Sequence, residues 1–142
     1  MKKILILGGG FAGIYTAKNL QKQYLEGYEI ELISDNNYFI FQPLLPEVAS
    51  GTIYSSDAVT PIRQMLKGIK YRNAEISSLD FNNKRVSILQ GFKKSSHSIE
   101  YDHLIIALGQ VSNLDIVKGL KDHAFTMRSL QDAYDLRNHI LG

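Results

Sequence analysis

The chain has 142 residues, of which 44% are hydrophobic and 21% charged, and its formal net charge at pH 7 is +2. This composition is typical of a globular fold and argues against a disordered chain. The charge is too small to favour nucleic acid, and the absence of cysteine excludes disulfides, thiolate metal sites and a redox-active dithiol within these residues.

A G-x-G-x-x-G motif opens the chain, between a strand predicted at Ile4–Leu7 and a helix predicted over 12–24. Gly8 permits the tight turn out of the strand, Gly10 lets a pyrophosphate approach the backbone, and Gly13 lets the helix pack closely on the sheet. The N–H groups and partial positive charge of the helix N-terminus favour phosphate. A tight turn without a ligand is the alternative interpretation.

The second predicted strand covers 28–34 and ends at Asp35. This acid follows the glycine motif by about 20 residues, the spacing at which a carboxylate accepts hydrogen bonds from a ribose hydroxyl in a βαβ unit. Alone, Asp35 would be an ordinary turn aspartate. The strand, the glycine motif, the helix and the acid together predict a dinucleotide-binding site.

The stretch 36–51 is apolar and aromatic without a steady period, so we expect a loop with one helical turn around 44–49. It is interpreted either as a cover for the core or as a wall against a large flat ligand. A short helix is then expected over 61–67, capped by Thr60 and beginning with a proline.

The middle of the chain is rich in strand patterns. A third parallel strand is expected at 69–72, followed by an antiparallel meander of strands at 75–81, 85–90 and 98–101. The continuous apolar run 104–108 predicts a buried central parallel strand. Gly109 ends it, either as a simple terminator or as a second point of backbone approach to a cofactor, because ligands bind beyond the carboxyl ends of such strands.

The last predicted element is a helix over 129–141, with Ser129 as its N-cap and Asp132 at the third position of a capping box. The four histidines have neither metal-like spacing nor a nucleophile motif, so no metal site and no catalytic residue are predicted. The elements together predict an α/β fold, a Rossmann-like parallel sheet with an inserted antiparallel three-stranded β-meander.

Four segments stand out together: ILILGGGFAGI, LISDNNYFIFQPLLPEVASG, YDHLIIALG and SLQDAYDLRNHILG. They resemble the N-terminal part of single-subunit, type II NADH dehydrogenases, which are flavoproteins with two dinucleotide-binding domains. The glycine motif is shared widely among such flavoproteins, whereas NYFIFQPLLP and RNHIL are more specific to this family. The resemblance extends over residues 3–142.

The resemblance implies FAD as cofactor, with its pyrophosphate at the glycine motif, its adenosine ribose at Asp35 and its flavin ring near Gln42 and Pro43. Residues 107–109 match the family's ATG element, although Leu108 replaces the usual threonine and loses a hydroxyl. The expected cofactor-binding residues are Gly8, Gly10, Phe11, Ala12, Gly13, Ser34, Asp35, Asn36, Gln42, Pro43, Ala107, Leu108 and Gly109.

The function implied is that of an NADH:quinone oxidoreductase, in which NADH gives a hydride to FAD and the electrons pass to quinone. Family members are much longer, with an NADH domain inserted into the FAD domain and a C-terminal membrane-docking part. We therefore expect residues 1–142 to be a single FAD-binding domain from a longer flavoprotein, catalytically incomplete alone. Its 129–142 helix would lead into the NADH domain.

The expected partners are FAD and, for the full-length enzyme, NADH and quinone, with no nucleic acid and no membrane contact from this segment. We expect a cytoplasmic protein whose full-length form is peripheral on the cytoplasmic membrane. The helix 129–141 exposes an apolar face that favours self-association. The alternatives are the FAD domain of a ferredoxin or rubredoxin reductase, a non-catalytic nucleotide-binding module and, third, a plain NAD(H) dehydrogenase domain.

Overall fold

The computed structural model describes residues 1–23 and 25–142. The chain divides into two compact units, each of which is described by itself. The first unit comprises residues 1–39 and 61–109, and the second comprises residues 40–60 and 110–142.

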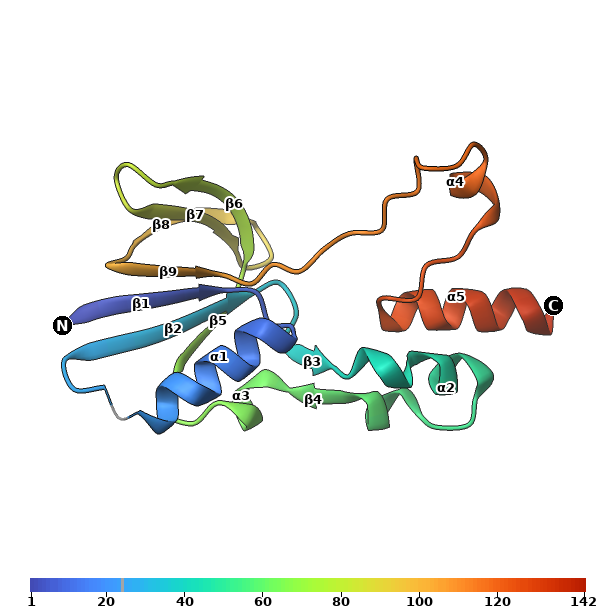
Figure 1. Cartoon of the computed structure of the whole chain (residues 1–142), viewed down its shortest axis with the longest axis horizontal. Helices are drawn as coiled ribbons and strands as arrows, with labels where there is room; N and C mark the ends of the chain where they lie inside the picture. The colour runs from blue at the N-terminus through green and yellow to red at the C-terminus, as the bar shows by residue number, and fades with distance from the viewer. Residues whose placement is uncertain (24) are drawn as a thin grey trace. The chain divides into compact units, whose positions relative to one another are not determined.

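The first unit is built on a parallel sheet of four strands in the order β5-β2-β1-β9 (Figure 1). Its strands are β1 (Lys2–Leu7), β2 (Tyr28–Ser34), β5 (Lys70–Asn73) and β9 (His103–Ile106). The chain moves to one side of β1 for β2 and β5 and to the other side for β9, so the strand order reverses beside β1. In open α/β sheets this switch point, at the carboxyl ends of the strands, is where ligands bind.

One face of this sheet is covered by α1 (Phe11–Lys22) and the short α3 (Ile62–Met65). Ile14 and Ala17, which lie three residues apart on one side of α1, are buried against the strands. The expected C-terminal residue of this helix, Tyr24, lies outside the described residues. The buried core on this face consists of Ile6, Ile14, Ala17, Leu32, Phe39, Ile62, Leu66, Ile69 and Tyr71.

The other face is covered by the antiparallel meander of β6 (Glu75–Asp80), β7 (Arg85–Gln90) and β8 (Ser95–Glu100), which Figure 1 shows above the sheet. The buried residues between the sheet and the meander form a second core, which consists of Leu5, Leu7, Ile33, Ala74, Val86, Ile88 and Ile99. The parallel sheet and the inserted meander are confirmed. Strand β8 begins at Ser95 and not at residue 98 as expected, because the turn before it closes early, where Lys94 N donates to Gly91 O at 3.0 Å.

A buried ion-pair network joins the meander to the sheet around Glu31, whose side chain is fully buried. Arg72 Nε donates to Glu31 Oε1 at 2.7 Å and Lys3 Nζ to Glu31 Oε2 at 3.3 Å. Arg72 Nη1 also donates to Gln90 Oε1 on β7 at 3.1 Å. Burial by itself would lower the pKa of Lys3, but hydrogen bonds to Glu29 and Glu31 raise it. Sheet and meander are therefore held together by charge as well as by apolar contact.

The expectation of a central strand at 104–108 was wrong. β9 ends at Ile106 and lies at the edge of the sheet in the part of the chain that the structure describes. Leu104 packs against the meander core and Ile105 against the helix core, so both faces of the strand are covered. The two covered faces account for Leu104 and Ile105, whereas Ile106 and Leu108 in the same run are about half exposed.

The short helix expected over 61–67 is present as α3 (Ile62–Met65), but the expectation that Thr60 caps it was wrong. Residues Val59–Pro61 form β4, which pairs with β3 (Tyr38–Ile40) in a two-stranded sheet. Thr60 is therefore in a strand, and Pro61 occupies the N-cap position of α3 without a side-chain cap. Ile62 N donates to Asn37 O at 3.0 Å, a long-range bond that holds the start of this helix.

The second unit contains short helical elements around the packed pair α2 (Leu45–Ser50) and α5 (Leu130–Leu141). The others are η1 (Gln42–Leu44), η2 (Ser55–Ala58) and α4 (Leu120–His123). Its fully or nearly buried core is Leu45, Val48, Ala58 and Ala133. The predicted helical turn around 44–49 is confirmed as α2. Its apolar residues Leu45 and Val48 are part of this unit's buried core. None of the helices in the described ranges is long and apolar enough to cross a membrane.

The predicted capping box of α5 is confirmed. Asp132 N donates to Ser129 Oγ at 3.1 Å, and Ser129 N donates back to Asp132 Oδ2 at 3.0 Å. Arg128 N donates to the same carboxylate oxygen at 2.7 Å. Burial alone would raise the pKa of Asp132, but the hydrogen bonds from Arg128 and Ser129 outweigh it and lower that pKa.

The first prediction concerns this cap. Asp132→Ala should lower the free energy of unfolding by about 1 kcal/mol at pH 7, because two backbone donors lose their acceptor. Since the folded pKa of Asp132 is lowered, its contribution is complete above the unfolded pKa and is lost as the pH falls through the folded pKa. Urea unfolding followed by circular dichroism at neutral and acidic pH measures this. An equal difference at both pH values would contradict the role.

Candidate functional site

The glycine motif forms the turn from β1 into α1, at the carboxyl end of the sheet. Gly8 has φ of +110°, which is strained for other residues, and its N–H donates to Ile33 O at 2.8 Å. A Cβ on Gly8 would overlap the carbonyl oxygen of Ala107, and a Cβ on Gly13 would overlap that of Gly8. The packing of the turn therefore requires glycine at both positions.

Gly9 is a third glycine that the packing requires, and the motif gave no sign of it. A Cβ at this position would lie 2.6 Å from Ser34 Oγ and 2.8 Å from Ile62 Cδ1. Both distances are shorter than real Cβ contacts. Gly9 therefore lets the glycine turn pack against the end of β2, which carries the predicted ribose-binding acid.

Gly10 differs from its neighbours, because nothing in the fold requires a glycine there. Its φ of −82° and ψ of −168° suit any residue, and a Cβ would meet no atom within 4 Å. The open space lies at the N-terminus of α1, whose first turn contains no acidic residue and whose helix dipole favours negative charge. Phe11 and Ala12 are exposed at the same place. A phosphate group would fit this position both sterically and electrostatically.

Asp35 is exposed immediately after β2, beside the buried Ser34. Asn36 N donates to Ser34 Oγ at 3.3 Å, and Asn36 Nδ2 donates to Asp35 Oδ1 at 3.2 Å. Residues 34–36, called the ribose loop below, thus form a local turn that leaves the Asp35 carboxylate accessible. Tyr71 and Asn73, at the end of β5, also hydrogen-bond this loop and were not singled out from the sequence.

Residues 107–109 follow β9 at the same edge of the sheet. Ala107 N donates to Leu7 O at 2.8 Å, which extends the β1–β9 pairing beyond the strand. Leu108 is about half exposed, and Gly109 has φ of +75° with open space around it. The structure therefore brings residues 107–109, the glycine motif and the ribose loop together along the carboxyl edge.

Gln42 and Pro43 belong to the second unit and are exposed at the start of η1. Gln42 Nε2 donates to Arg128 O at 3.1 Å, so its amide links η1 to the segment that precedes α5. Arg128 also donates through its guanidinium to Gln110 O. In this unit the Gln42 side chain therefore takes part in internal hydrogen bonding.

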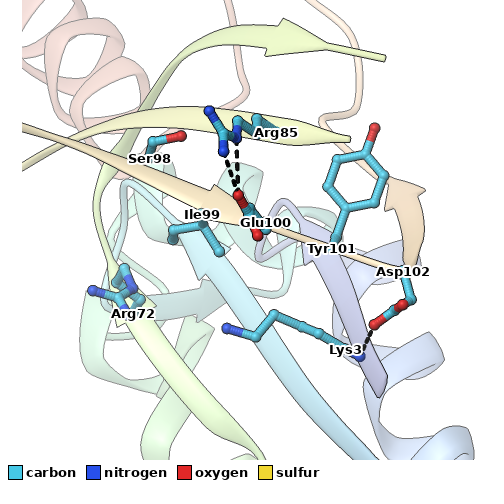
Figure 2. Close-up of a pocket in the computed structure, with 8 residues that line it drawn as sticks. All are labelled: Lys3, Arg72, Arg85, Ser98, Ile99, Glu100, Tyr101 and Asp102. Carbon is cyan, nitrogen blue, oxygen red and sulfur yellow. Dashed lines mark hydrogen bonds and ion pairs between the residues drawn. The ribbon is translucent and has the colours of Figure 1, made fainter. Parts of the chain in front are cut away.

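A shallow pocket of about 750 Å³ lies on the opposite face of the sheet, under the meander (Figure 2). It is lined by Lys3, Arg72, Arg85, Ser98, Ile99, Glu100, Tyr101 and Asp102, which include no predicted cofactor residue. Arg85 Nε donates to Glu100 Oε1 at 3.0 Å, and Lys3 N donates to Asp102 Oδ2 at 2.6 Å. Arg85 and Glu100 therefore form an ion pair, whereas the Lys3 ammonium and the Arg72 guanidinium pair with the buried Glu31. Within the described residues, no acidic or histidine cluster could hold a metal ion.

Comparison with known proteins identifies the family. The model of the pyridine nucleotide-disulphide oxidoreductases matches residues 2–142. The chain belongs to this family. The match includes the glycine turn, the ribose loop and the segment after β9 described above, and it confirms the resemblance noted from the sequence.

Two curated proteins are similar to this chain over most of its length. The demethylphylloquinone reductase NdbB of Synechocystis is 36% identical over 97% of this chain and 35% of its own length. The type II NADH:quinone oxidoreductase of Staphylococcus haemolyticus is 36% identical over 98% of this chain and 34% of its own length. The chain thus spans about a third of the length of these relatives.

Among solved structures, NDH2 from Plasmodium falciparum in complex with RYL-552 has a TM-score of 0.85 and 30% identity. The match covers 99% of this chain and 28% of that protein. The Rossmann-like fold is therefore confirmed. The pyridine nucleotide-disulphide oxidoreductases and the type II enzymes among these relatives bind FAD, the cofactor expected from the sequence.

The second prediction distinguishes the glycine that the packing does not require, Gly10, from one that it does require, Gly13. Gly10→Ala should leave the free energy of unfolding unchanged or raise it by up to about 1 kcal/mol, because a Cβ fits and the unfolded chain loses entropy. Gly13→Ala should lower it by more than about 2 kcal/mol, because the Cβ overlaps backbone. Chemical denaturation of both variants measures the difference. Comparable destabilisation by the two substitutions would contradict this account of the turn.

Proposed function

We propose that this chain is the FAD-binding domain of an NADH:quinone oxidoreductase of the type II class. The observation that supports it best is Gly10, whose lack of a side chain serves no packing need and leaves open the space above the N-terminus of α1. The names of the curated relatives, a demethylphylloquinone reductase and a type II NADH:quinone oxidoreductase, favour a quinone acceptor over a ferredoxin-type partner.

The residues present fit a bound FAD. The N–H groups at the start of α1, on Phe11 and Ala12, would hold the pyrophosphate, and the Asp35 carboxylate would accept hydrogen bonds from the adenosine ribose. Residues Ala107–Gly109, of which Leu108 and Gly109 are exposed, would border the cofactor at the switch point of the sheet. We also assign Gln42 and Pro43 to the flavin end of the site, as the family resemblance implies.

When bound, FAD supplies the redox chemistry, taking up a hydride and releasing electrons. The protein's own contribution is then binding and orientation. The dipole of α1 would offset the charge of the pyrophosphate, and the turn at Gly8 and Gly13 would fix where that charge lies. Because the cofactor would carry the redox chemistry, the chain needs to supply no nucleophile and no acid–base pair. In the complete enzyme, we propose, NADH and quinone are the substrates, and the protein is peripheral on the cytoplasmic membrane.

The third prediction tests cofactor binding. The purified chain, mixed with FAD, should carry the visible flavin absorption bands through gel filtration. Asp35→Ala should weaken FAD binding by about 1.5–3 kcal/mol, the range for a hydrogen bond to a charged group, as measured by titration. Asp122→Ala, which removes an exposed acid in the second unit, serves as the matched control.

Two outcomes would count against this proposal. Retention of NAD but not of FAD would assign the glycine motif to a different cofactor. Unchanged FAD affinity in Asp35→Ala would remove the ribose role from that carboxylate, even if the chain binds flavin.

A further inference from the structure

The ribose loop is held along its whole length by two side chains of β5. Asn73 Nδ2 donates to Ser34 O at 3.1 Å and to Asp35 O at 2.9 Å. Tyr71 Oη donates to Asn36 O at 2.9 Å and accepts from Asn73 Nδ2 at 3.3 Å. Three successive carbonyl groups of the loop thus accept hydrogen bonds from the same two residues.

The sheet register places these side chains under the loop. Ser34, the last residue of β2, is opposite Asn73, the last residue of β5, and Ala74 N donates to Ser34 O at 3.0 Å. Tyr71 is 8% exposed in the core on the helix face, where the Arg63 guanidinium lies 5.2 Å from its ring centre. The Tyr71 hydroxyl is therefore presented from a side chain with little freedom to move.

The hydrogen bonds of the Asp35 side chain to other described residues are local. Its Oδ1 accepts from Asn36 Nδ2 at 3.2 Å and lies 3.5 Å from Ser34 Oγ, and both partners belong to the loop. The long-range bonds all reach the backbone, so the direction of the Asp35 carboxylate depends on how firmly that backbone is held. β5 fixes the backbone and leaves the carboxylate accessible.

We propose that Asn73 and Tyr71 are positioning residues, which hold the ribose loop so that Asp35 meets the ribose of a bound dinucleotide. This inference rests on the proposed function, because it assigns Asp35 a ligand. The amide of Asn73 suits the task, since its short side chain carries two donor hydrogens and meets two carbonyl oxygens. An aspartate at this position would have no donor and would repel both carbonyls.

The fourth prediction is a double-mutant cycle on FAD affinity. Asn73→Ala should weaken FAD binding by about three- to tenfold, and Tyr71→Phe by a smaller factor, because hydrogen bonds between neutral groups are lost. In an Asp35→Ala background, Asn73→Ala should change the affinity by less than about twofold, because it acts through that carboxylate. Asn82→Ala, an exposed asparagine in the β6–β7 turn, is the matched control.

A second measurement does not depend on FAD. Amide hydrogen exchange at Asn36 and Ala74 should become about tenfold faster in Asn73→Ala, while the amides of β1 and α1 stay protected. An equal loss of affinity with and without Asp35, or unchanged exchange in the loop, would overturn the positioning role. If the unmodified chain takes up no FAD, the proposed function fails, and hydrogen exchange still decides whether Asn73 holds the loop.

Discussion

The structure of the first unit depends on a contact between backbone segments that leaves no room for side chains. Gly8 lies against the carbonyl of Ala107, and Gly13 lies against the carbonyl of Gly8. This contact brings the end of β1, the start of α1 and the end of β9 to one point at the edge of the sheet. The N-terminus of α1 consequently points to the switch point between β1 and β9, where the helix dipole favours a bound anion.

Two further sets of contacts in the first unit stabilise the segments that meet at this edge of the sheet. Under the meander, the buried Glu31 network and the apolar core stabilise the face of the sheet opposite α1. At the next strand along, Asn73 and Tyr71 fix the backbone that carries Asp35. The glycine turn packs against the ribose loop where Gly9 lies beside Ser34.

The sequence predicted features that arise from local chemistry. β2 was predicted at Tyr28–Ser34 because its residues are strongly strand-forming and end in a turn, and the capping box of α5 was predicted because it spans only four residues. Features set by long-range pairing were missed. Thr60 was taken as a helix cap because its pairing in β4 is invisible locally, and the roles of Gly9 and Asn73 appear only once β2 lies beside the glycine turn and β5.

The most direct test of the central claim is a map of amide chemical shifts in the ¹⁵N-labelled chain as FAD is added. The account predicts the largest shifts at Gly10–Ala12 and at Asp35–Asn36, with smaller ones at Ala107–Gly109. Residues Lys3 and Tyr101, in the pocket under the meander, should show little change. Shifts concentrated in that pocket, with none at the glycine turn, would contradict the claim that the turn is a pyrophosphate site.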